Sequence, residues 1–170
     1  MEDQVALVFW VCLQVRIVSI TYLSLVELSI EFGPWRPIQN GSLVSNPWSW
    51  TKVANLVFLE QPVGVGFSYG TDPDELLAYN DYRASIDNLL TIRTFFTRFP
   101  ERANQAFYVA SESYGGHYIP QWTLQLFSDA TLRKNFKGML VGNPFTSYAS
   151  GSIAMANVMW GLQLVPQPIW

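Results

Sequence analysis

The chain has 170 residues, of which 49% are hydrophobic and 15% aromatic, and its formal net charge at pH 7 is −3. This composition is sufficient for one buried core and argues against disorder. The slightly acidic balance, with no basic stripe, argues against a nucleic-acid partner, and the single cysteine, Cys12, excludes an internal disulfide.

Residues 1–30 are largely apolar but fit neither a membrane span nor a secretory signal well. The apolar run from Val5 to Val15 contains Gln14 and is followed by Arg16, whereas a span needs about 20 predominantly apolar residues. A secretory signal begins with basic residues, and this chain begins with acidic ones. We therefore favour a buried strand near Val5–Val11, followed by an apolar segment of uncertain structure, over a transmembrane or signal role.

The next segment is rich in turn signals. Phe32 to Pro37 contains glycine and two prolines, and Asn40-Gly41-Ser42 is a typical tight turn. The same three residues form a sequon, so Asn40 is a candidate for N-glycosylation, although such short patterns are common by chance.

Three short apolar runs predict the strands of a parallel sheet. They are Val53–Leu59, Phe107–Ala110 and Phe136–Gly142, and continuous apolar runs of this length are typical of strands that are buried on both faces. Helical patterns separate them, which indicates the α/β class with a mostly parallel sheet flanked by helices.

The first of these helices is expected to open at Asp72-Pro73, where the residues suit a cap and a first helical turn, and to end before Pro100. A second helix is predicted from Gly115 to Phe127, with a disturbance at Pro120. A short helical piece is expected near Ile153–Trp160. Apolar residues recur at helical spacing along the first helix: Tyr82, Ile86, Leu89, Leu90 and Phe96.

The sequence Ser111-Glu112-Ser113-Tyr114-Gly115 lies between a predicted strand and a predicted helix, which is the setting of a nucleophile elbow. Small residues two before and two after the serine, here Ser111 and Gly115, let strand and helix approach each other. Ser113 is therefore the candidate nucleophile, and the backbone N–H of Tyr114 can bind a developing oxyanion. The alternative is a serine in an ordinary strand–helix turn.

Several motifs together resemble the serine carboxypeptidases, an α/β-hydrolase family. The resemblance runs from about Ile30 to the C-terminus. It is carried by Asn46-Pro47-Trp48-Ser49-Trp50, Glu60 to Tyr69 (EQPVGVGFSY), Phe99-Pro100-Glu101, Glu112-Ser113-Tyr114, His117 to Gln121 (HYIPQ) and Val141-Gly142-Asn143.

The resemblance implies a carboxypeptidase that removes C-terminal residues from peptides, works best in acid and needs no cofactor or metal. It assigns the nucleophile to Ser113 and part of the oxyanion hole to the amide of Tyr114. It also assigns binding of the substrate carboxylate to Glu112 and Glu31, which would share a proton because two close carboxyls cannot both ionise cheaply. A secreted, vacuolar or lysosomal location is implied in the same way.

The chain departs from the family pattern at two places. The family sequence W-x-N-G-G-P-G-C-S-S supplies the second oxyanion amide, but here Trp10 is followed by Val11-Cys12-Leu13-Gln14, without the glycines. The only histidine is His117, four residues after Ser113 on the same predicted helix, where a packed residue is a better interpretation than a general base.

We therefore expect residues 1–170 to form a single incomplete α/β-hydrolase domain that lacks its C-terminal part and is inactive as a polypeptide. An uncovered sheet edge would favour self-association. Two other functions stay open: a non-catalytic relic or binding protein that keeps the fold, and an acyltransferase that uses the same acyl-enzyme. The sequence does not determine which side chains a substrate would carry.

Overall fold

The computed structural model describes residues 7–13, 32–65, 68–71 and 78–166. Its strands and α-helices, in chain order, are β1 (Leu7–Leu13), β2 (Trp35–Pro37), β3 (Leu43–Ser45), β4 (Asn55–Gln61), α3 (Asp81–Arg98), β5 (Phe107–Glu112), α4 (Gly115–Ser128), β6 (Phe136–Gly142) and α5 (Tyr148–Gly161). Short 3₁₀ turns cover Trp50–Lys52, Pro100–Arg102 and Leu132–Lys134.

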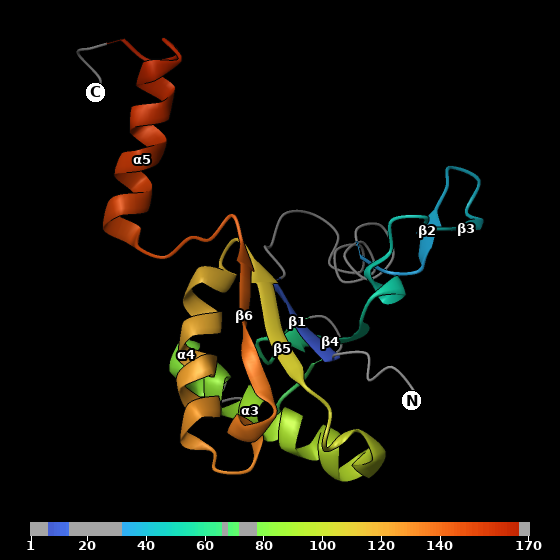
Figure 1. Cartoon of the computed structure of the whole chain (residues 1–170). Coiled ribbons are helices and arrows are strands. Elements are labelled where there is room, and N and C mark those ends of the chain that lie inside the picture. Colours follow the sequence, from blue (N-terminus) through green and yellow to red (C-terminus); the bar gives the residue numbers. More distant parts are fainter. Residues whose placement is uncertain (1–6, 14–31, 66–67, 72–77, 167–170) are drawn as a thin grey trace.

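The main sheet contains four parallel strands in the order β4-β1-β5-β6, so the predicted parallel sheet is confirmed. β6 has the predicted bounds, whereas β1 and β4 each begin two residues later than expected. β2 and β3 form a separate antiparallel pair, and the turn between them contains Asn40 and Gly41. Figure 1 shows this hairpin away from the main sheet.

Strand β4 is half-buried on both of its faces. Along β4, Val57 and Leu59 pack against the larger buried cluster, whereas Leu56 and Phe58 pack against a smaller cluster around Ala110. This alternation follows from the two-residue period of a strand. It explains why an unbroken apolar run identified the strand.

The larger cluster lies between the sheet and helices α3 and α4, which pack against each other and against the sheet (Figure 1). At its centre the ring of Phe9 meets three other rings edge-on, those of Phe95, Phe96 and Phe107, with centroids 5.2, 5.9 and 5.6 Å away. Such edge-to-face pairs add to the stabilisation that comes from burial. Other fully buried members of the cluster are Ile92, Val109, Ile119, Trp122 and Leu126.

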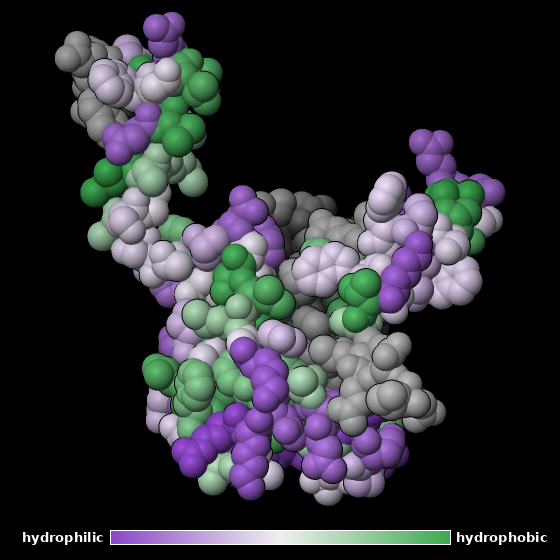
Figure 2. Space-filling view, in the orientation of Figure 1, coloured by the Kyte–Doolittle hydropathy of each residue, from purple (hydrophilic) through white to green (hydrophobic). Residues whose placement is uncertain are grey.

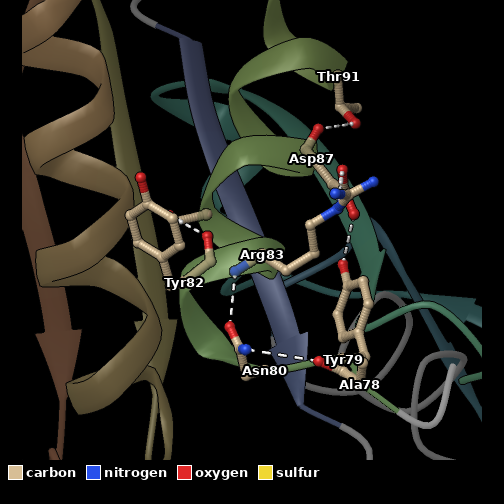
Figure 3. A network of polar contacts seen from close by, with 8 residues as sticks. Ala78, Tyr79, Asn80, Tyr82, Arg83, Asp87 and Thr91 are labelled. Carbon is tan, nitrogen blue, oxygen red and sulfur yellow. Dashed lines mark hydrogen bonds and ion pairs between the residues drawn. The ribbon is translucent and has the colours of Figure 1, made fainter. Parts of the chain in front are cut away.

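Helix α3 begins at Asp81, so the prediction of one helix from Asp72 to Pro100 is wrong at its N-terminal end. Asn80 has an extended backbone, and its Oδ1 accepts a hydrogen bond from the N–H of Arg83 at 3.0 Å (Figure 3). This is an N-cap, which satisfies one of the first free N–H groups of the helix. Residues 72–77 lie outside the described part of the chain.

A polar network joins the segment before α3 to the first turns of the helix (Figure 3). The hydroxyl of Tyr79 donates to Oδ2 of Asp87 at 2.8 Å, and Arg83 Nε lies 3.7 Å from Asp87 Oδ1. Burial and the hydrogen bond to Asp87 raise the pKa of the Tyr79 hydroxyl, so the tyrosine stays neutral and remains a donor. The network fixes the entry of the chain into α3.

Helix α4 runs from Gly115 to Ser128 with Pro120 inside it, so the disturbance expected there does not divide the helix. Helix α5 extends away from the rest of the chain (Figures 1 and 2), and none of its residues is buried. The sequence from Gly138 to Trp170 carries no Asp, Glu, Lys, Arg or His. Among the described residues, no helix combines the length and apolarity needed to cross a bilayer.

One ion pair, between the buried Asp129 and the largely exposed Arg93, connects α3 to the end of α4. Arg93 Nε donates to Asp129 Oδ2 at 2.6 Å, and Asp129 Oδ1 accepts from the N–H groups of Thr131 and Leu132 at 2.8 and 2.9 Å. Burial raises the pKa of the Asp129 carboxyl, but the Leu132 N–H, the Arg93 guanidinium and the Thr131 N–H outweigh burial and hold that pKa below its usual value. The ionised carboxylate therefore stabilises the fold.

We predict that Asp129→Asn lowers the free energy of unfolding by about 1–3 kcal/mol. The neutral amide has only one acceptor oxygen, so it cannot both accept from Arg93 and accept from the N–H groups of Thr131 and Leu132. The folded-state pKa is lowered, so this stabilisation is present above the unfolded-state pKa of about 3.9 and is lost as pH falls through the folded value. Urea unfolding between pH 7 and pH 3 measures the stability of each chain and its decrease as the pH falls. The stability of the variant should decrease less over this pH range than that of the unsubstituted chain.

The matched control is Arg83→Gln, which breaks the ion pair between Arg83 and Asp87. The side chain of Arg83 is 52% exposed and that of Asp87 is 38% exposed. Exposed pairs contribute little, so the control should change stability by less than about 0.5 kcal/mol. Equal losses in the two variants would contradict a structural role for the Asp129 carboxylate.

Candidate active site

Ser113 lies between β5 and α4, at the carboxyl end of the sheet. Its φ is 57°, in the left-handed region that side-chain-bearing residues seldom adopt. Strained backbone of this kind persists only where the surroundings determine it, and it concentrates at functional sites. A serine in this conformation between a buried strand and a helix has the geometry of a nucleophile elbow.

The small residues of the motif are required by close contacts. A Cβ on Gly115 would collide with the side chain of Ser111, which is fully buried. A Cβ on Gly116 would lie 2.5 Å from the carbonyl oxygen of Phe145 and 2.7–2.8 Å from its carbonyl carbon and nitrogen. The start of α4 is therefore packed directly against both the preceding strand and the segment that follows β6.

Backbone hydrogen bonds hold Ser113 from both sides. Its N–H donates to the carbonyl of Gly142 at 3.0 Å, and its carbonyl accepts from the N–H of Phe145 at 2.7 Å and of Gly116 at 3.1 Å. Gly142 is the last residue of β6, and Phe145 lies in the link to α5. The end of β6 and the link that follows it thus maintain the left-handed conformation.

The backbone N–H of Tyr114 has no acceptor among the described residues. It belongs to the turn that opens α4, where the helix dipole favours negative charge. A donor at this position can stabilise an oxyanion that forms next to Ser113. The sequence prediction for Tyr114 is compatible with this placement.

The side chain of Tyr114 connects three elements. Its hydroxyl donates to Asp81 Oδ2 at 3.1 Å and lies 3.1 Å from the hydroxyl of Tyr148. A phenol has one proton, so Tyr148 is the donor in the second contact. The hydrogen bond with Tyr148, burial and the hydrogen bond to Asp81 raise the pKa of the Tyr114 hydroxyl, which stays neutral and keeps both contacts.

His117 is packed among aromatic rings. Its imidazole stacks on Tyr114 with centroids 4.7 Å apart, and it also contacts Phe145 and Tyr148 at 5.5 and 5.2 Å. Its Nε2 is buried and has no hydrogen-bond partner within the described part of the chain. These contacts favour the interpretation of His117 as a packed helix residue over that of a general base.

The remaining predicted site residues lie in different places. Glu112 is the exposed last residue of β5, beside Ser113 and in register with Gly142. Glu31 lies outside the described residues, so its pairing with Glu112 stays a prediction. Asn40 is exposed in the β2–β3 turn, where its Oδ1 accepts from the N–H of Ser42 at 2.9 Å, and its glycosylation likewise stays a prediction.

The Gly-rich loop that follows β4 lies at the same carboxyl edge of the sheet. Gly64 has φ 88°, a conformation that favours glycine, and its N–H donates to the carbonyl of Ser68 at 2.9 Å. Asn88 of α3 donates to the side chain of Gln61, which is buried at the end of β4. The loop is thereby fixed to α3 on the same edge as Ser113.

Sequence reasoning did not identify Asp81, Phe145 or Tyr148 as part of this region. Asp81 and Tyr148 are 33 and 34 positions from Tyr114, and no local pattern signals such contacts. Within the part of the chain that the structure describes, His, Cys, Asp and Glu side chains form no group of three that could hold a metal ion.

A parallel sheet that leads through a strained serine turn into a helix defines part of an α/β-hydrolase fold. Residues 23–170 match the sequence family described as serine carboxypeptidase, peptidase S10. The chain belongs to the serine carboxypeptidase family. The family resemblance that the motifs indicated is therefore confirmed.

Individual relatives agree with this assignment. Serine carboxypeptidase-like 26 of Arabidopsis thaliana is 38% identical over 136 residues, which is 79% of this chain and 30% of that protein. Carboxypeptidase Y homolog A of Sclerotinia sclerotiorum is 44% identical over 125 residues, 72% of this chain and 22% of that protein. The chain thus spans less than a third of the length of these relatives.

A solved structure supports the fold. Kex1(delta)p, a prohormone-processing carboxypeptidase from Saccharomyces cerevisiae, is similar to this chain with a TM-score of 0.76 and 22% sequence identity. The similarity covers 96% of this chain and 35% of that structure.

We predict that Gly116→Ala lowers the free energy of unfolding by about 1–3 kcal/mol, because the added methyl group meets backbone atoms that cannot move aside. Gly161→Ala is the matched control, since nothing lies within 4 Å of a Cβ at that helical position. The control should stay within about 0.5 kcal/mol of the unsubstituted chain. Chemical denaturation measures both, and equal stabilities would contradict the close packing of α4 on Phe145.

Proposed function

We propose that the protein acts as a serine-type carboxypeptidase, in which Ser113 forms an acyl-enzyme with the peptide and releases its C-terminal residue. The observation that carries the proposal is the left-handed backbone of Ser113, next to a Tyr114 N–H that faces no acceptor in the described structure. An ordinary strand–helix turn has no need of such strain.

The proposed chemistry begins with attack of Ser113 Oγ on the carbonyl carbon of the last peptide bond. The carbonyl oxygen becomes negative, and the N–H of Tyr114 and the N-terminal end of α4 stabilise that charge. Collapse of this intermediate expels the C-terminal amino acid and leaves an ester on Ser113, which water then hydrolyses.

The reaction needs a general base to accept the Ser113 proton, and the 170-residue sequence does not offer a suitable one. His117 is the only histidine, and its ring is packed against Tyr114, Phe145 and Tyr148. We therefore propose that this polypeptide is inactive by itself and that the base and its acid partner come from outside these 170 residues.

We further propose that Glu112 binds the terminal carboxylate of the peptide together with Glu31. Glu112 is exposed and directly precedes the nucleophile, as such a role requires. A carboxyl that shares a proton with a neighbour can donate a hydrogen bond to a carboxylate, and this arrangement would favour binding in acid.

The experiment is a transplant into an active relative. Residues 46–147 of this chain replace the equivalent segment of the Sclerotinia carboxypeptidase Y homolog, which supplies the rest of its own length. We expect the hybrid to release C-terminal residues from a blocked dipeptide, and Ser113→Ala in the hybrid to lower kcat/KM by about 1,000-fold or more. Circular dichroism and thermal unfolding establish that both hybrids fold.

The 170-residue polypeptide assayed alone should show no turnover above that of its own Ser113→Ala variant. A folded hybrid without Ser113-dependent activity would contradict the proposed function and favour a non-catalytic carboxypeptidase-like protein. Activity of the polypeptide alone that disappears in Ser113→Ala would contradict the claim that the base lies elsewhere.

A further inference from the structure

The peptide group between Ser113 and Tyr114 is held firmly on its carbonyl side. The Ser113 carbonyl oxygen accepts hydrogen bonds from two N–H groups, that of Phe145 at 2.7 Å and that of Gly116 at 3.1 Å. The Gly116 bond is local to the start of α4. The Phe145 bond is not, because Phe145 lies in the link between β6 and α5.

The planarity of the peptide group carries this constraint to the other side of the bond. In a trans peptide the C=O and the N–H point in opposite directions from one rigid plane. A carbonyl fixed towards Phe145 therefore directs the N–H of Tyr114 away from Phe145. That N–H is the proposed oxyanion donor, and no described residue accepts from it.

Two further contacts keep the β6–α5 link in place on the elbow. The absence of a side chain on Gly116 lets the backbone of Phe145 approach closely, since a Cβ there would lie 2.5 Å from the Phe145 oxygen. Beyond the link, the Tyr148 hydroxyl meets the Tyr114 hydroxyl at 3.1 Å. The link is thus attached to residue 114 through its side chain and to the peptide group before it through the backbone.

We propose that Phe145 is a positioning residue, whose backbone N–H sets the direction of the Tyr114 N–H and so prepares the oxyanion site. The inference rests on the proposed function, because it presumes that an oxyanion forms beside Ser113. The active part of Phe145 is its backbone, so side-chain changes at this position leave the effect intact. A movement of the β6–α5 link would weaken oxyanion stabilisation without touching Ser113.

The test separates the backbone of Phe145 from its side chain. Phe145→phenyllactic acid, introduced as a backbone ester, keeps the ring and removes only the N–H. Phe145→Ala is the matched control, which removes the ring and keeps the N–H. Phe145→Pro is a second variant that also lacks the backbone N–H. It needs only an ordinary amino acid and is used if the ester chain folds poorly.

The readout is phosphonylation of Ser113 by a fluorophosphonate in the 170-residue chain, with imidazole in solution as the base. Ser113 Oγ forms a bond to phosphorus, fluoride leaves and imidazole takes the proton, while oxyanion donors stabilise the charged phosphoryl oxygen. Mass spectrometry identifies the labelled residue, and circular dichroism gives the folded fraction of each variant.

We expect the ester and Phe145→Pro variants to label at least about tenfold more slowly than Phe145→Ala, since one oxyanion donor is worth about 100- to 1,000-fold. Equal labelling rates in the ester and alanine variants would overturn the inference and leave the proposed function standing. Labelling that is undiminished in Ser113→Ala would contradict the proposed function instead.

Hydrogen exchange gives an outcome that does not depend on reactivity. The Phe145 amide of the unsubstituted chain should exchange at least about tenfold more slowly than an unprotected amide, because it donates to Ser113. Exchange at the unprotected rate would overturn the inference whatever the labelling shows.

Discussion

The left-handed backbone at Ser113 is the constraint around which the described structure is organised. This conformation brings the residue's Cβ close to the following carbonyl oxygen and costs roughly 1–2 kcal/mol for any residue except glycine. It persists because the N–H and the carbonyl of Ser113 are both bonded to the end of β6 and the link beyond it. The pairing of β5 with β6 therefore supports the backbone conformation of the elbow.

The rest of the fold provides that pairing. Rings from β1, α3 and β5 meet at Phe9 and fix the sheet against its helices, and the Arg93–Asp129 pair fixes α3 to the end of α4. The closest contacts occur where the turn has least room, at Gly115 against Ser111 and at Gly116 against Phe145. A packed core thus stabilises one strained residue at its edge, which is how proteins prepare reactive groups before a substrate arrives.

The sequence predicted what depends on local patterns. β6 was predicted with its observed bounds and the elbow motif placed Ser113 correctly between strand and helix, because apolar runs and small residues near a serine are local signals. The start of α3 was missed, since Asp72-Pro73 offers a good cap but Asn80 is the residue that caps the helix. Helical spacing identified the buried face of α3 only in part, because Phe96 is buried and Leu89 packs against the core, whereas Tyr82 and Leu90 are exposed.

Contacts between residues far apart in sequence could not be predicted in this way. Asp81, Tyr148 and Phe145 reach the elbow only because β5 and β6 are neighbours in the sheet and α3 begins at the same edge. None of the three belongs to a recognisable local motif. Asp81 is the first residue of α3, Tyr148 is the first residue of α5, and Phe145 lies in the link between β6 and α5. Their contacts with the elbow follow from the order of the strands in the sheet, and the spacing of motifs along the sequence does not predict that order.

The most direct test of this account compares the stabilities of Ser113→Gly and Ser113→Ala. At an ordinary position alanine is the more stabilising residue by about 0.4–1 kcal/mol, because glycine is freer in the unfolded chain. At a position with positive φ the order reverses, since only glycine adopts it without strain. The account predicts that Ser113→Gly unfolds at a higher urea concentration than Ser113→Ala, and a more stable Ser113→Ala would contradict the strained elbow on which the candidate site depends.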